Sequence, residues 1–86
     1  MTQQLIPLTL LASHEEGTVV KLDGGRGFIS RLATLGFTPG TQLAMVQNFG
    51  RGPLIVCVRD ARIAMGRGEA AKVIVLRRNQ HGPDPS

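Results

Sequence analysis

The stretch RLATLGFTPG, from Arg31 to Gly40, decides how this chain folds. The apolar residues Phe28, Leu32 and Leu35 recur at spacings of four and three residues as the chain passes through it. This period is typical of one face of a short helix. It predicts a helix that packs Leu32 and Leu35 into the interior of the domain.

The same stretch contains the signals that end the helix and begin a strand. Gly36 follows the last periodic residue and suits the left-handed conformation that often ends a helix. Pro39 comes three residues later, where a helix cannot continue. Beyond Gly40 apolar and polar residues alternate, which is the period of a strand. We therefore expect a helix, a glycine stop and a strand from Thr41 to Gln47.

The rest of the chain reads as short strands separated by Gly and Pro turns, with one helical turn expected within residues 66–72. An apolar edge segment is expected at residues 5–11, where it packs Leu8 and Leu11. The predicted fold is mainly β, a small SH3-like β-barrel of about five short strands with one short helix inserted after the first main strand. An OB-fold is the alternative, although its helix usually lies between later strands. The other strands are expected at Gly17–Leu22, Leu54–Val58, Arg62–Met65 and Val73–Arg77.

The length of the chain, 86 residues, is enough for one domain. We place this domain at residues 5–78 and expect residues 1–4 and 79–86 to be flexible ends. A chain of this size buries roughly 60% of the surface that its unfolded form exposes. The core is therefore thin and leaves little room for a deep substrate pocket.

Charge and cysteine content narrow the function classes. Ten Lys and Arg against six Asp and Glu give a net charge of +4, which favours acidic partners. The alternative is that scattered arginines form a solvated surface, because no basic block and no Trp or Tyr is present. Cys57 is the only cysteine, which fits a reducing compartment and a cytoplasmic protein. No apolar run approaches the ~20 residues that span a bilayer, so we expect a peripheral contact with a membrane at most.

Several motifs together resemble the FeoA family of small ferrous iron transport proteins. The resemblance runs from about Leu8 to Leu76, and the stretch RLATLGFTPG is its most specific part. Two departures affect turns: Ser13-His14 stands where the family often has Pro-Gly, and Asp60 stands where it often has Gly. The other matching features are Gly17 with Val19, the Gly24-Gly25 turn, Gly52-Pro53 followed by Leu54, Val56 and Val58, then Ile63, Met65, Ala70, Val73 and Val75.

The resemblance implies a non-catalytic accessory protein of bacterial ferrous iron uptake. Such a protein would bind and modulate the cytosolic GTPase part of a FeoB-type membrane transporter and would need no cofactor. The motif residues themselves are read as architecture, because glycines supply backbone angles and leucines fill a barrel. These structural residues are Arg31, Leu32, Leu35, Gly36, Pro39 and Gly40.

The strand at residues 54–58 supplies the candidate partner surface. If Leu54, Val56 and Val58 face inward, Ile55 and Cys57 face outward, where the family often has polar residues. An outward apolar pair can mark a surface for a partner or for a homo-oligomer. The alternative is burial of this pair under the N-terminal segment or the helix. The candidate contact residues are Ile55, Cys57, Arg26, Arg51 and Arg59.

Metal binding is weighed because of the resemblance. His14, Glu15 and Glu16 form the only local cluster of nitrogen and oxygen ligands, to which His81 or Asp84 could be added. Adjacent residues on a strand point to opposite faces, but a loop relaxes that limit. The two interpretations are a weak surface site for Fe(II) or Zn(II) and a solvated acidic turn.

No set of residues predicts catalysis, because Cys57 lies in a strand with no histidine near it in sequence. The chain is therefore not expected to be an enzyme. Two other functions stay open. One is a small SH3-like nucleic-acid-binding module, against which the low aromatic content counts, so no nucleic acid is expected. The other is a metal-sensing domain that acts with a repressor, and it could act only in trans because the chain lacks a helix-turn-helix.

Overall fold

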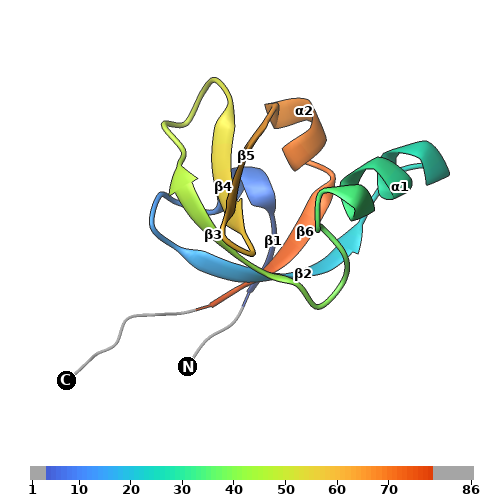
Figure 1. The fold of residues 1–86 in the computed structure, drawn as a ribbon. Helices are drawn as coiled ribbons and strands as arrows, with labels where there is room; N and C mark the ends of the chain where they lie inside the picture. Colours follow the sequence, from blue (N-terminus) through green and yellow to red (C-terminus); the bar gives the residue numbers. More distant parts are fainter. Residues whose placement is uncertain (1–3, 79–86) are drawn as a thin grey trace.

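The computed structural model describes residues 4–78, which form one sheet with two short helices and a 3-10 turn (Figure 1). The helical turn expected within residues 66–72 is present at residues 67–70. The elements are β1 (Gln4–Pro7), η1 (Leu8–Leu10), β2 (Glu16–Leu22), α1 (Arg26–Thr34), β3 (Gln42–Gln47), β4 (Leu54–Val58), β5 (Ala61–Met65), α2 (Arg67–Ala70) and β6 (Val73–Arg77).

The strands pair in the order β1-β6-β2-β3-β4-β5, and every neighbouring pair is antiparallel. Within the described residues this makes six strands instead of about five, because the expected edge segment forms β1 and pairs with β6. That strand begins at Gln4, one residue before the expected domain boundary. β1 and β5 are the two ends of this sheet, so strand pairing does not close it into the expected barrel.

The hydrophobic core is built from alternate residues of the strands. In β4, for example, Leu54 and Val56 are fully buried and Val58 is 2% exposed, so the inward face is the predicted one. The N-terminal segment contributes Leu8 and Leu11, both fully buried as expected. The other core residues are Val19, Leu32, Phe37, Leu43, Met45, Met65, Ala70, Val73 and Val75.

Helix α1 projects from the sheet and is attached to the core at its C-terminal end (Figure 1). Leu32 is its only buried residue, whereas Leu35 is 44% exposed, so the prediction that both fill the interior is wrong for Leu35. The helix ends at Thr34, and Gly36 has the predicted left-handed conformation with φ 97°. This turn directs Phe37, the next residue, into the core in place of Leu35.

The turn between β4 and β5 fixes the register of these two strands. Arg59 and Asp60 both have positive φ, at 50° and 69°, which is the type I′ geometry that matches the twist of a two-residue hairpin. Val58 therefore lies opposite Ala61, and the pairing continues without a shift to Leu54 opposite Met65. The departure at Asp60 changes the turn residue and keeps the turn.

Candidate interaction surface

The outward face of β4 carries the two apolar residues that the sequence singled out. Ile55 and Cys57 are half-buried, and they alternate with the buried residues of the same strand. Their orientation is therefore the predicted one, away from the core. They are neither freely exposed nor covered, which leaves a shallow apolar strip for a partner to cover.

The neighbouring strands place a short alanine side chain beside each of these two residues, and β5 adds the charge of Arg62. Cys57 lies between Ala44 of β3 and Arg62 of β5 in the sheet register. Ile55 lies between Gln47 and Ala64 in the same way. Alanine side chains are too short to cover a neighbour fully, and Cys57 and Ile55 accordingly remain only half-buried.

A shallow hollow of about 250 Å³ lies beside this strip and contains Cys57 but not Ile55. Arg59 and Asp60 of the β4–β5 turn border it at one side. Glu16 and Arg78 border it as well, and Arg78 Nη1 is 3.7 Å from Glu16 Oε1. The remaining residues of its lining are Gly17, Thr18, Gln42, Leu43 and Ala44. This hollow can accept a side chain from a partner but is too open to enclose a substrate.

The predicted arginines are not brought together. Arg59 borders the hollow next to Cys57. Arg51 is exposed in the β3–β4 loop, at the opposite end of β4 from Arg59. Arg26 is the first residue of α1, which lies on the side of the molecule away from that loop (Figure 1). The candidate surface therefore consists of Ile55, Cys57 and Arg59, with Arg51 at its far end and Arg26 outside it.

The sequence did not single out Arg62, which shares the outward face with Cys57. The two-residue spacing between β4 and β5 would have predicted the position of Arg62 beside Cys57. A two-residue hairpin at Arg59-Asp60 places Val58 opposite Ala61, and one step further places Cys57 opposite Arg62. Arg78 could not be found in this way, because it directly follows β6, which is distant in sequence from β4.

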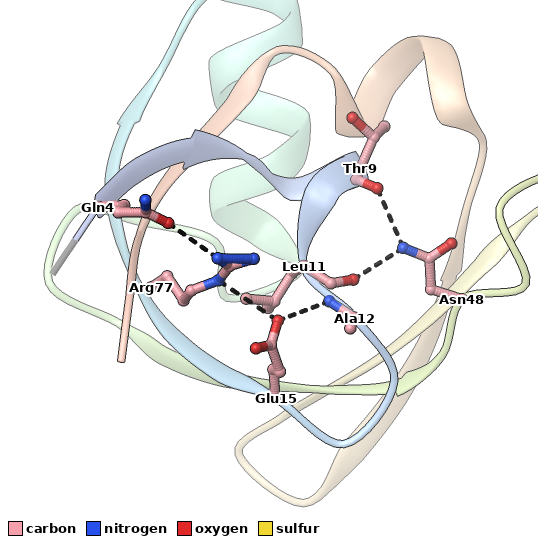
Figure 2. A network of polar contacts seen from close by, with 7 residues as sticks. All are labelled: Gln4, Thr9, Leu11, Ala12, Glu15, Asn48 and Arg77. Carbon is pink, nitrogen blue, oxygen red and sulfur yellow. Dashed lines mark hydrogen bonds and ion pairs between the residues drawn. The ribbon is translucent and has the colours of Figure 1, made fainter. Parts of the chain in front are cut away.

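The N-terminal segment is attached to the β3–β4 loop by a set of hydrogen bonds around Asn48, shown in Figure 2. The Asn48 side-chain nitrogen donates to the carbonyl oxygens of Thr9, at 3.0 Å, and Leu11, at 2.7 Å. Its side-chain oxygen accepts from the Gly50 N–H, at 3.0 Å, and from Arg67. One amide thus joins the N-terminal segment, the loop and α2 directly after the end of β3.

The three predicted metal ligands do not converge in the structure. Glu15 Oε1 accepts a hydrogen bond from the Ala12 N–H at 2.8 Å and lies 3.4 Å from Arg77 Nε (Figure 2). Glu16 is paired with Arg78, and His14 is exposed with φ 74°. Within residues 4–78 no group of three or more His, Cys, Asp or Glu is arranged to hold a metal ion. The weak site for Fe(II) or Zn(II) stays a prediction, and His81 and Asp84 lie outside the described residues.

Comparison with known proteins matches this chain to one family and to relatives that are named for iron transport or iron uptake. The FeoA domain family matches residues 6–77. A protein of Methanocaldococcus jannaschii named as an Fe(2+) transport protein A is 37% identical over 71 residues, which cover 83% of this chain and 85% of that protein. A crystal structure of an iron uptake regulatory protein (FeoA) matches with a TM-score of 0.83 at 31% identity, covering 87% of this chain and 100% of that one.

A further solved structure relates this fold to SH3 domains. The FeoA of Stenotrophomonas maltophilia, crystallised with zinc and described as an SH3 domain protein, has a TM-score of 0.70 at 32% identity. The match covers 79% of this chain and 86% of that one. The present fold is accordingly that of a small SH3-like module, mainly β with one inserted helix. The chain belongs to the FeoA family. No helix within residues 4–78 is long and apolar enough to cross a membrane.

Proposed function

We propose that this protein is a non-catalytic accessory of ferrous iron transport, which acts in the cytoplasm by binding the cytosolic GTPase part of a FeoB-type transporter. The observation that carries the proposal is the family match over residues 6–77, which covers nearly all of the described residues 4–78. Its relatives are named for Fe(2+) transport or iron uptake. The protein would act by contact and would need no cofactor.

The contact surface in this proposal is the outward face of β4. The apolar pair Ile55 and Cys57 supplies area that a partner would remove from water, which is the main source of binding free energy. Arg59 at the end of the strand adds a charged group that orients an acidic partner surface. Arg51 lies at the far end of the strip and would act in the same way.

A binding measurement with the isolated cytosolic domain of the transporter tests this surface. The expected result is capture by the wild-type protein and a loss of at least about tenfold in affinity for Ile55→Glu, because a carboxylate would be placed against the apolar contact. Arg59→Glu serves as a second variant, since its side chain is exposed and its replacement leaves the core intact.

Ile29→Glu is the matched control. Ile29 is 40% exposed on α1, so the substitution adds the same charge to an apolar position on another element. Unchanged binding by Ile55→Glu and Arg59→Glu, with both variants folded by circular dichroism, would remove β4 from the interface. Absence of binding by the wild-type protein would contradict the proposed partner itself.

A further inference from the structure

The outer edge of β5 is a strand edge without a partner within the described residues. β5 is the last strand in the sheet order and pairs only with β4. The two-residue turn makes Val58 and Ala61 a hydrogen-bonded pair, so alternate residues of β5 point their backbone groups away from β4. These residues are Arg62 and Ala64. Their N–H and C=O groups form a template on which another strand can pair.

The core-facing side of β5 becomes less covered toward its start. Met65 is 2% exposed, Ile63 is half-buried, and Ala61 is exposed, although all three lie opposite core residues of β4. No strand lies beyond β5 in the sheet order, so no neighbouring strand covers the outer side of Ile63 and Ala61. An added strand would cover Ile63 and Ala61 with its own inward side chains.

Charge selects the kind of strand that fits. Arg62 is exposed on the outward face of β5, and Arg59 is exposed in the turn just before it. Within residues 4–78 neither guanidinium lies within 4.0 Å of a carboxylate, and the nearest acid in sequence is the exposed Asp60. The edge therefore favours a strand whose outward side chains are acidic.

We propose that the free edge of β5 binds an extended segment of a partner protein in which acidic and apolar residues alternate. The segment pairs with the backbone groups of Arg62 and Ala64. Its apolar side chains cover Ile63 and Ala61, and its carboxylates lie beside Arg62. A second copy of this chain fits less well, because each copy carries a net charge of +4 and its own Arg62 at the edge. The inference goes beyond the proposed function, since it holds for any protein that presents such a segment.

The test uses the full chain and a blocked seven-residue peptide of alternating glutamate and valine, followed by amide hydrogen exchange in NMR spectra. At peptide concentrations ten times the dissociation constant, exchange at Arg62 and Ala64 is expected to slow by about tenfold. The matched peptide with lysine in place of glutamate should give less than a twofold change. Equal protection by both peptides, or shifts confined to other strands, would overturn the proposal.

Two pairs of variants separate the backbone from the charge contribution. Ala64→Pro removes an outward N–H that makes no ladder bond, so it should fold and lose peptide binding, whereas Ala64→Val should retain it. Arg62→Glu should weaken binding by about tenfold or more, and Lys21→Glu, an equal charge change at an exposed position of β2, should have a smaller effect. Binding retained by folded Ala64→Pro would contradict strand pairing. Protection of the edge that rises with protein concentration without peptide would assign the edge to a second copy instead.

Discussion

Asn48→Ala is expected to lower the free energy of unfolding by about 3 kcal/mol, which is a large part of the 5–15 kcal/mol typical of a domain. The substitution leaves the Thr9 and Leu11 carbonyls without the donor that the structure gives them, and it removes the acceptor for Gly50 and Arg67. Partly buried groups left unpaired cost more than the bonds themselves contribute. Urea unfolding followed by circular dichroism measures the loss.

Two further variants identify the cause of that loss. Asn48→Asp has nearly the same shape and keeps an acceptor for Gly50 and Arg67, but it removes both donors and brings a carboxylate toward two carbonyl oxygens. It should therefore remain destabilised by about 2 kcal/mol. Gln47→Ala, one residue earlier on β3, should cost less than about 1 kcal/mol. A change of less than about 0.5 kcal/mol for Asn48→Ala would mean that the amide does not hold these three elements together.

The second large effect is expected for Leu32→Ala, at about 3 kcal/mol of lost stability, because a fully buried leucine is replaced and a cavity is left. Leu32 is the only buried residue of α1, so the helix should also lose its attachment to the core. Amide exchange of α1 should then accelerate more than that of β2 and β6, which remain paired.

Leu35→Ala is the matched control for this prediction. It makes the same chemical change in the residue that follows α1, but Leu35 is 44% exposed, so the loss should stay below about 1 kcal/mol. The structure would be contradicted if the two substitutions cost the same, or if Leu35→Ala cost more. That result would instead match the expectation from the apolar period, in which both leucines fill the interior.

The contrast between these two leucines shows which part of the helix packing could not be predicted from the sequence. The spacing of Phe28, Leu32 and Leu35 predicts one helix face, and Gly36 correctly predicts its end. The same glycine also reverses the chain, and Phe37 then enters the core in place of Leu35. Periodicity describes a continuous helix and carries no information on the path beyond its stop. The strand segments are easier to predict, because β-branched and apolar residues concentrate in short stretches bounded by turn residues.

The candidate surface likewise has features that the sequence predicts and features that it does not predict. The outward orientation of Ile55 and Cys57 follows from alternation alone and is confirmed. The hollow next to Cys57 depends on Arg78, which approaches through the pairing of β2 with β6. The separation of Arg26 from Arg59 depends on how α1 projects from the sheet. Neither long-range arrangement is encoded in local spacing, so the sequence could give the strand but not the composition of the surface.

The role of Asn48 could not be predicted from the sequence either. It follows the strand expected from Thr41 to Gln47, and its partners lie 37 and 39 residues earlier in the chain. A polar residue in a loop has the same local pattern whether it faces solvent or joins three elements. Only the tertiary structure distinguishes these cases.

Iron uptake in cells tests whether this protein supports ferrous iron transport through the outward face of β4. The measurement is the initial rate of radiolabelled Fe(II) uptake in a strain that lacks this protein and retains its transporter. We expect a reduced rate that is restored by the wild-type protein and by Ile29→Glu but not by Ile55→Glu, at equal protein levels. An uptake rate that is unchanged without the protein, or is fully restored by Ile55→Glu, would contradict it.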